Sequence, residues 1–316
     1  MDLLTLLGCL VVLFFVLKLV ELYMRTLYLD TKNKCVLVTG CDTGFGHLLA
    51  QELDKRGIRV FASCLTEEGE KKLLEKCSSK AVVFRLDVTK EESIQNAVKL
   101  VKTKIAGNEL LWGLVNNAGV FLLAAPLEWQ AKEQYEKTLA VNLYGVIEMT
   151  RVFLPLLRQS RGRVVNMSSI ASMLAFPKLA PYNISKAALE SFTDTLRREM
   201  YNIGVTAHII QPSGFKTNII PADATHRLRK AFDDLPQEVK DFYGEKSVNM
   251  GHTEVVKIQS LGDPDLTKVT KVIQHALFAR YPRYRYPVGK GAVSIFWTFS
   301  HFPEIIPDKL YAMSAP

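Results

Sequence analysis

Hydrophobic and polar residues follow two different patterns along the chain. Residues 3–17, LLTLLGCLVVLFFVL, contain no charged residue, and the apolar character continues to residue 29 with single charges such as Lys18 and Arg25. From residue 34 onward, short apolar segments alternate with amphipathic ones. The first pattern predicts a helix close to the length that crosses a bilayer, which needs about 20 apolar residues. The second predicts a separate folded domain.

The N-terminal helix, within residues 1–29, is expected to remain as a membrane anchor. A cleaved signal peptide is the rival interpretation, but the start MDLL has an acid where a basic region belongs, and no clear small-x-small site follows. Basic residues follow the apolar run at Lys18, Arg25, Lys32 and Lys34. Because positive charge favours the cytosolic side, we expect the rest of the chain to face the cytosol.

The remaining pattern is an alternation of apolar strands and helices. Strands are predicted at residues 34–40, 58–64, 81–88, 110–119, 162–169 and 204–212. Helices are predicted between them, at residues 46–57, 91–105, 135–157 and 181–202. Buried strands separated by helices favour a parallel sheet covered on both faces. We therefore predict a single doubly wound α/β domain of the Rossmann type over residues 30–290.

Composition excludes several functional classes. The chain has 316 residues and a net charge of +8, but its basic residues are scattered among acids. They form no aromatic-interleaved basic stripe, so nucleic-acid binding is not expected. The five cysteines are odd in number and show no CxxC spacing. Neither a disulfide framework nor a metal site is predicted.

A glycine-rich turn lies between the first predicted strand and the first helix. The segment TGCDTGFG, residues 39–46, contains Gly40, Gly44 and Gly46. Glycines there let the backbone approach a pyrophosphate, whose charge the helix N-terminus favours. The spacing differs from the GxGxxG fingerprint, and such a turn can be only a tight connection. Its position in the first βα unit favours dinucleotide binding.

A tyrosine and a lysine are spaced four residues apart at the start of the helix predicted from residue 181. Positions i and i+4 share one helical face, so Tyr182 and Lys186 are expected to project side by side. A free phenol titrates near 10, and a neighbouring ammonium favours the phenolate. The pair is a candidate proton-transfer device, although the same spacing also occurs by chance in helices.

Six motifs in sequence carry a family resemblance. They are TGxxxGxG at 39–46, LDVT with Asp87, NNAG at 116–119, VNLYG with Asn142, NMSS with Ser169 and YxxxK at 182–186. Their order and intervals resemble those of the short-chain dehydrogenase/reductase family. The resemblance spans nearly the whole chain after the predicted anchor.

The resemblance implies an NAD(P)-dependent dehydrogenase and assigns roles to the matching residues. Tyr182 would be the general base, and Lys186 would lower its pKa and bind the nicotinamide ribose. Ser169 would bind the substrate oxygen, and Asn142 would hold a water that links Lys186 to solvent. Asp87 and Val88 would flank the adenine, and Thr217 would contact the carboxamide. The implied cofactor-binding set is Gly40, Asp42, Gly44, Phe45, Gly46, Asp87, Val88, Asn117, Ala118, Gly119, Tyr182, Lys186 and Thr217.

NAD is expected in preference to NADP. A 2′-phosphate needs a cation near the adenosine ribose, and neither the glycine turn nor the residues directly after the second strand supply one. Asp42, Glu67 and Glu68 would repel a phosphate. The acid that usually ends the second strand is missing, and Ser63 or Cys64 takes its place.

A second departure from the family pattern lies after the sixth strand. The family has Pro-Gly there, whereas this chain has Ser213 between Pro212 and Gly214. If the backbone at Ser213 required a positive φ, a residue other than glycine would be strained. The assignment of the loop beside the nicotinamide therefore depends on this backbone.

Longer segments resemble the membrane-bound branch of retinol dehydrogenases, type 2 hydroxysteroid dehydrogenases and 3-hydroxybutyrate dehydrogenase. Residues 170–181, IASMLAFPKLAP, lack the glycine triplet of retinol dehydrogenases and have one more residue. A hydroxysteroid is therefore the expected substrate, with retinol next. One alternative is a 3-hydroxybutyrate-type enzyme, in which Lys178 or Lys216 would clamp a carboxylate. The other is a non-catalytic NAD-binding protein, which would be expected to lack Tyr182 or Lys186.

The peripheral segments are expected to serve the substrate and the membrane. Residues 217–269 would close over the substrate, with His252 as an ordinary surface residue. Residues 291–316 are apolar but too short and proline-broken to span a bilayer, so they would pack on the domain or lie at the membrane surface. Glycans at the sequons Asn166 and Asn183 would obstruct the site, which favours a cytosolic body. The resemblance implies the endoplasmic reticulum membrane, with a mitochondrial membrane as the alternative, and a homodimer as one candidate assembly.

Overall fold

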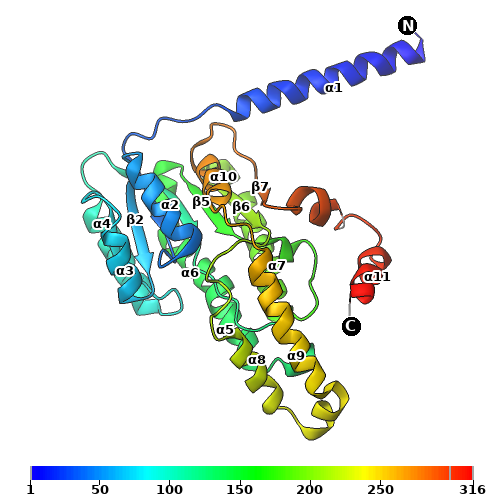
Figure 1. Ribbon diagram of the computed structural model, residues 1–316. Coiled ribbons are helices and arrows are strands. Elements are labelled where there is room, and N and C mark those ends of the chain that lie inside the picture. Colours follow the sequence, from blue (N-terminus) through cyan, green and yellow to red (C-terminus); the bar gives the residue numbers. More distant parts are fainter. Residues whose placement is uncertain (1, 299, 315–316) are drawn as a thin grey trace.

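The computed structural model describes residues 2–298 and 300–314. A sheet domain forms the body of the molecule, and helix α1 (Leu3–Arg25) projects from it (Figure 1). The C-terminal elements η5 (Ala292–Trp297) and α11 (Ile305–Ser314) extend from the body toward the same side as α1 (Figure 1).

Seven parallel strands form one sheet in the order β3-β2-β1-β4-β5-β6-β7. Their bounds are β1 (Lys34–Val38), β2 (Arg59–Cys64), β3 (Val82–Arg85), β4 (Leu110–Asn116), β5 (Arg163–Met167), β6 (Thr206–Pro212) and β7 (Arg285–Val288). The order reverses between β1 and β4, and open α/β sheets bind ligands beyond the carboxyl ends of the strands at such a point. The predicted doubly wound fold is confirmed.

Helices cover both faces of the sheet. One face carries α2 (Gly44–Lys55), α3 (Glu67–Leu74) and α10 (Thr267–Phe278); the other carries α4 (Glu91–Lys104), α6 (Val146–Ser160) and α7 (Ala180–Glu199). Helix α4 shows why these segments are helical, because its buried residues Ile94, Ala97, Val98 and Val101 recur at the spacing of one helical face. The two cores hold the strand ends of the site in fixed positions.

Strand β7 and helices α3 and α10 were not among the predicted elements of this domain. Strand β7 has only four residues, includes Pro287 and lies at the edge of the sheet, where a proline is tolerated because no partner strand needs its N–H. In addition, the helix predicted at 135–157 is divided into α5 (Lys132–Leu139), a π-helical turn η2 (Ala140–Gly145) and α6.

The segment predicted to close over the substrate is largely helical. It forms α8 (Ala224–Asp233) and α9 (Gln237–Leu261), with a break in α9 at Gly244. The two helices extend away from the sheet (Figure 1). Leu228, Phe232 and Val248 form a small core with Leu123 and Trp129, which follow β4. The insertion therefore packs on the chain that leaves the carboxyl end of the sheet.

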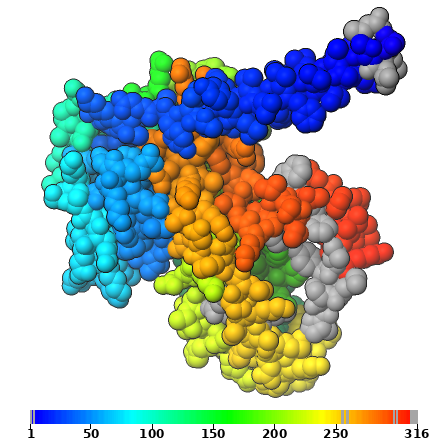
Figure 2. Space-filling model, turned by 45° about the horizontal axis from the view of Figure 1, so that its top comes forward, coloured from blue at the N-terminus to red at the C-terminus, as the bar shows by residue number. Residues whose placement is uncertain are grey.

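Helix α1 is joined to the body at its base only. The window Thr5–Arg25 has a mean hydropathy of 2.4 and none of it is buried, so by length and composition it could cross a membrane. Figure 2 shows its outer half clear of the body. After it, Leu29 N donates to Phe278 O at 2.8 Å, and Arg280 N donates to Leu27 O at 2.7 Å. A second apolar stretch, Lys132–Ser160, is one-third buried and belongs to the domain.

Candidate active site

The turn between β1 and α2 requires its glycines. Gly40 and Gly44 have φ angles of +68° and +66°, a region that favours glycine. A Cβ on Gly40 would lie 2.7 Å from Ala118 Cα, and one on Gly46 would collide with the side chain of Asn117. The turn therefore lies directly against the end of β4, at the point where the strand order reverses.

Hydrogen bonds tie these two strand ends together. The Asn117 amide Nδ2 donates to the carbonyls of Thr39 at 2.9 Å and Gly40 at 2.8 Å. In return, Thr39 Oγ1 accepts from the backbone N–H groups of Asn117 and Ala118, both at 3.0 Å. Thr39 was not among the predicted site residues. In this structure the Asn117 side chain shapes the turn itself.

The first turn of α2 offers donors to an anion. Helix α2 begins at Gly44, and its N-cap residue Thr43 makes no side-chain capping hydrogen bond. N–H groups at a helix N-terminus that lack an internal partner favour phosphate. The glycine cradle and this uncapped helix end fit the pyrophosphate of a dinucleotide.

Asp42 reaches the end of β2. Its carboxylate accepts from Leu65 N at 2.8 Å, from Thr66 N at 2.8 Å and from Thr66 Oγ1 at 2.6 Å. Because β2 ends at Cys64, a negative charge lies where the sequence lacks the usual strand-end acid. Asp42, in the turn after β1, thus places a carboxylate at the end of β2, which carries no acid of its own.

Residues after β3 form the next part of the crevice. Asp87 Oδ1 accepts from Thr89 N at 2.9 Å and from Thr89 Oγ1 at 2.7 Å, which closes a tight turn before α4. Val88 is 9% exposed. A Cβ on Gly145 would lie 2.8 Å from Val88 Cγ2, so the π-helical turn η2 packs against it.

The loop after β6 lies over the glycine turn. A Cβ on Gly44 would be 3.6 Å from the Thr217 side chain, and the rings of Phe45 and Phe215 meet edge to face at 5.4 Å. In the described chain, Ser213 does not have a positive φ, so its backbone is not strained in the way considered above. Its N–H donates to Val288 O at 2.8 Å, which ties the loop to β7.

Helix α7 holds the tyrosine and lysine on its buried side. Pro181 lies in its first turn, where the missing N–H costs nothing. Lys186 is 3% exposed, and its Nζ donates to Met167 O at 2.8 Å. The same Nζ lies 5.5 Å from the centroid of the Tyr182 ring. The two side chains thus lie together at the carboxyl end of β5.

Burial dominates the ionisation of this pair. It raises the pKa of Tyr182 to about 12, which a side-chain hydrogen bond with Ser169 opposes. It also lowers the pKa of Lys186 to about 8, which the charge of Glu190 opposes. Desolvation of the phenolate outweighs the Ser169 hydrogen bond. Burial thus acts against the lowering that is expected from Lys186 on sequence grounds. Burial therefore makes the Tyr182 hydroxyl a weaker acid than a free phenol.

Asn142 is fully buried in the π-helical turn η2. Its Nδ2 donates to Val120 O at 2.9 Å and to Ser185 Oγ at 3.1 Å, and its Oδ1 accepts from Val120 N at 2.8 Å. A Cβ on Gly119 would lie 3.4 Å from Asn142 Oδ1 and 3.7 Å from Lys186 Nζ. The end of β4, the π-helical turn and α7 therefore meet at one point, and π-bulges are frequent at functional sites.

The structure also places the two candidate carboxylate-binding lysines and His252. The backbone of Lys178 has a φ of +68° and its carbonyl accepts from Gln130 Nε2 at 2.9 Å. Lys216 N donates to Asp263 O at 3.0 Å. His252 lies half-buried on α9, and its Nε2 is 3.0 Å from Thr225 O, which joins α9 to α8.

The two sequons differ in accessibility. Asn166 is 0% exposed, and its Nδ2 donates to Thr193 Oγ1 at 2.8 Å. Asn183 is half-buried and donates to Phe176 O at 2.8 Å. Because Asn166 lies in the middle of the core, a glycan there is incompatible with this fold.

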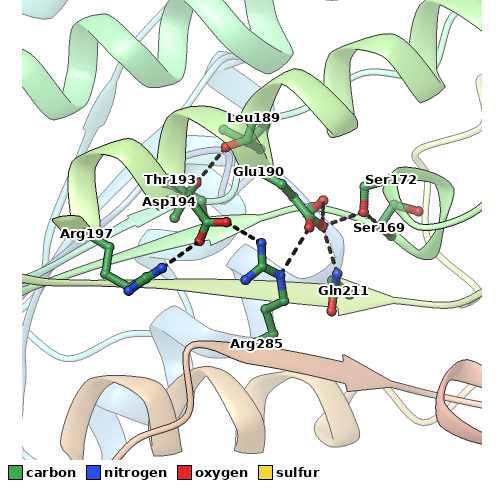
Figure 3. A network of polar contacts seen from close by, with 11 residues as sticks. Ser169, Ser172, Leu189, Glu190, Thr193, Asp194, Arg197, Gln211 and Arg285 are labelled. Atoms are coloured by element: carbon green, nitrogen blue, oxygen red, sulfur yellow. Dashed lines mark hydrogen bonds and ion pairs between the residues drawn. The ribbon is translucent and has the colours of Figure 1, made fainter. Parts of the chain in front are cut away.

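One acidic residue that the sequence argument missed lies beside the pair. Glu190, one turn beyond Lys186, collects polar side chains from β6, β7 and the Ser169 turn (Figure 3). The signal was available, because extending the Tyr182–Lys186 spacing by four residues reaches Glu190.

A dinucleotide cradle and a buried tyrosine–lysine pair at the same sheet edge define the class of NAD(P)-dependent oxidoreductases. The pattern of the family described as "short chain dehydrogenase" matches residues 34–227. The chain belongs to this family, in the branch that includes the retinol dehydrogenases.

Individual relatives match over most of the chain. Retinol dehydrogenase 7 of Rattus norvegicus is 43% identical over 278 residues, covering 88% of this chain and 87% of the relative. Short-chain dehydrogenase/reductase family 9C member 7 of Homo sapiens is 40% identical over 288 residues, covering 91% of each. Among solved structures, a short-chain dehydrogenase from Streptomyces avermitilis is 25% identical with a TM-score of 0.69, covering 90% of this chain and 96% of that one.

Proposed function

We propose that this protein is a membrane-anchored dehydrogenase that oxidises a lipophilic alcohol with NAD. The observation that carries the proposal is the meeting of Tyr182, Lys186 and Ser169 at the carboxyl end of β5. This meeting point lies next to Gly119, at the end of the strand that borders the glycine turn.

Each of these residues has a role that its surroundings support. Tyr182 takes the proton of the substrate hydroxyl, and Ser169, which is hydrogen-bonded to Tyr182, binds the same oxygen and stabilises its charge. Lys186 is an ammonium below a pKa of about 8, and it favours the phenolate of Tyr182.

NAD, when bound, accepts hydride from the carbinol carbon and brings a positive nicotinamide close to the site. The glycine turn and the uncapped start of α2 would hold its pyrophosphate. The Asp42 carboxylate at the end of β2 disfavours a 2′-phosphate, which supports NAD over NADP. Thr217, above Gly44, would approach the nicotinamide side.

Retinol is the first candidate substrate, because relatives at 41–43% identity are named retinol dehydrogenases. This differs from the order expected from residues 170–181 alone. A hydroxysteroid is the second candidate, supported by those same residues, which begin with the turn η3 (Ile170–Ser172) and lead into Tyr182.

The N-terminal helix would bring the enzyme to its substrate. Helix α1 offers an apolar surface of spanning length, and Val293, Ile295 and Ile305 of the C-terminal segment are about half exposed or more. These segments lie on one side of the body and would contact the same membrane. Within this proposal the body faces the cytosol at the endoplasmic reticulum. Protease protection of the body in sealed microsomes would contradict that orientation.

The test is NADH formation by detergent-solubilised full-length protein with all-trans-retinol, androstanediol, estradiol and 3-hydroxybutyrate, each with NAD and with NADP. We expect turnover of at least one lipophilic alcohol, faster with NAD. Turnover of 3-hydroxybutyrate alone would favour the water-soluble substrate class. Binding of NAD without turnover of any of these alcohols would contradict the proposal.

A further inference from the structure

The carboxylate of Glu190 gathers four side chains. Its Oε1 accepts from Ser168 Oγ at 2.8 Å, from Gln211 Nε2 at 2.9 Å and from Ser172 Oγ. Its Oε2 faces Arg285 Nε at 3.4 Å (Figure 3). The side chain of Glu190 is only 13% exposed, so the bonds are largely shielded from water. Charge-assisted hydrogen bonds of this kind are about twice as strong as neutral ones.

These partners come from segments that surround the candidate site. Ser168 directly follows β5, and Ser172 ends the η3 turn that Ser169 begins. Gln211 lies on β6, which leads into the loop over the glycine turn, and Arg285 begins β7. Glu190 itself lies on α7 with Tyr182 and Lys186. One carboxylate therefore connects the helix of the proposed base to the turn of the proposed oxyanion donor.

The Ser169 turn depends on this connection. Ser172 Oγ also donates to Ser169 O at 2.5 Å, so Glu190 and the Ser169 carbonyl share one hydroxyl. On the other side of Ser169, Ser168 N donates to Ile210 O at 2.8 Å, while its side chain turns to Glu190. Glu190 thus binds one residue on each side of Ser169, namely Ser168 directly before it and Ser172 three positions after it. A displacement of about 1 Å in a reacting group can cost 10²-fold in rate.

We propose that Glu190 is a positioning residue of this enzyme, which holds the Ser169 turn against α7 so that Ser169 and Tyr182 address the same substrate oxygen. The proposal rests on the proposed function, and it adds a residue that touches neither substrate nor cofactor.

Glu190 also acts on the charge of Lys186. Lys186 is packed against Tyr182 on its own helix, against Met167 O on β5 and near Gly119 and Asn142. Among these neighbours Glu190 supplies the negative charge that opposes the fall in the pKa of Lys186 caused by burial. Removing this charge lowers the pKa of Lys186 further, so the ammonium is lost at a lower pH.

The substitution Glu190→Gln tests both effects because it keeps the shape and removes the charge. We expect kcat/KM for the alcohol to fall about 10- to 100-fold, with an unchanged KM for NAD. We also expect the alkaline limb of the pH–rate profile to move to lower pH. Ser172→Ala should lower kcat/KM without moving that limb, since it removes one tie and no charge.

The matched control is Asp194→Asn. Asp194 lies one turn further along α7 and accepts from Arg285 Nη2 at 2.7 Å and Arg197 Nη2 at 3.4 Å (Figure 3). It shares Arg285 with Glu190 and has no bond to the serines. We expect its kcat/KM to stay within about threefold of the unmodified enzyme.

A second readout is independent of turnover. Amide hydrogen exchange over residues 168–173 should accelerate in Glu190→Gln and in Ser172→Ala and stay unchanged in Asp194→Asn. If Glu190→Gln melts at a much lower temperature, Ser172→Ala alone decides through the same exchange window. Wild-type exchange in both variants, or wild-type kcat/KM and pH profile in a folded Glu190→Gln, overturns the proposal. An unmodified protein that oxidises no alcohol would instead overturn the proposed function, and the exchange result would still decide the role of Glu190 in positioning.

Discussion

Helices α1 and α7 depart from the usual burial of residues in opposite directions. Along α1, large apolar side chains face outward, with Phe15 at 61% and Leu19 at 66% exposure. Along α7, polar side chains face inward, with Lys186 at 3% and Ser185 at 0% exposure. Exposed apolar patches and buried charges both cost free energy in water. We propose that each departure serves a partner outside the chain: a membrane for α1, and a cofactor and substrate for α7.

The free-energy cost of burying the Lys186 ammonium on α7 follows from its pKa. Burial lowers the pKa of Lys186 from 10.5 to about 8, which corresponds to about 3 kcal/mol at neutral pH. The chain retains this cost in a helix that could hold an apolar residue there. Within the proposed function, this lysine serves catalysis at the expense of stability.

The largest expected effect concerns α1. Replacing Leu10 and Leu13, which are 53% and 52% exposed, by arginine adds about 3 kcal/mol each to insertion. We expect the double variant to leave the membrane pellet after carbonate extraction, whereas the double alanine variant stays in it. If the arginine variant remains in the membrane pellet, α1 is not the membrane anchor.

The next effect concerns the buried lysine. Lys186→Met should lower the oxidation rate about 10²- to 10³-fold at neutral pH, while the melting temperature does not fall. The pKa of Lys186 is lower in the folded protein than in the unfolded chain, so the folded protein binds this proton more weakly. The free energy of unfolding of the unmodified protein therefore rises by about 1 kcal/mol between pH 7 and 9. Thermal melts at the two pH values should show this gain in the unmodified protein and not in the variant. A large drop in melting temperature would mean that Lys186 serves the fold.

A smaller effect separates buried polar residues with and without a catalytic role. His208 is 0% exposed on β6, and burial lowers its pKa to about 3. The fold favours the neutral form of His208, so its contribution to the free energy of unfolding is complete above pH 6.5. This contribution is lost as the pH falls toward 3, and the loss is about 2 kcal/mol at pH 5. His208→Gln should reduce this acid sensitivity, measured by urea unfolding at pH 7 and pH 5. Its activity at pH 7.5 should stay within about twofold, and a larger loss would give His208 a role in the site.

Local patterns were sufficient to predict most of the sheet. Strands β1 to β6 are apolar runs bounded by helical segments, so periodicity located them. Strand β7 was not predicted, because its four residues lie at the sheet edge, include a proline and do not form an apolar run. The glycine turn and the Tyr182–Lys186 pair were found because each is contained in a short stretch of sequence.

Features that depend on contacts between distant segments were not predicted. Asp42 fills the place of the missing strand-end acid because the turn after β1 lies beside the end of β2. The i, i+4 spacing along the helix reaches Glu190, but the three other segments that supply its partners are known only from the fold. The effect of burial on the pKa of Tyr182 was not predicted, because burial is a property of the folded molecule.

The central claim is that Tyr182 is the base, and one comparison tests it most directly. NADH fluorescence is followed with all-trans-retinol for the unmodified protein and for Tyr182→Phe, with NAD affinity measured in the same samples. The proposed mechanism predicts a loss of kcat of about 10²- to 10⁴-fold with NAD affinity nearly unchanged. A variant that binds NAD and retains more than about a tenth of the rate would contradict it.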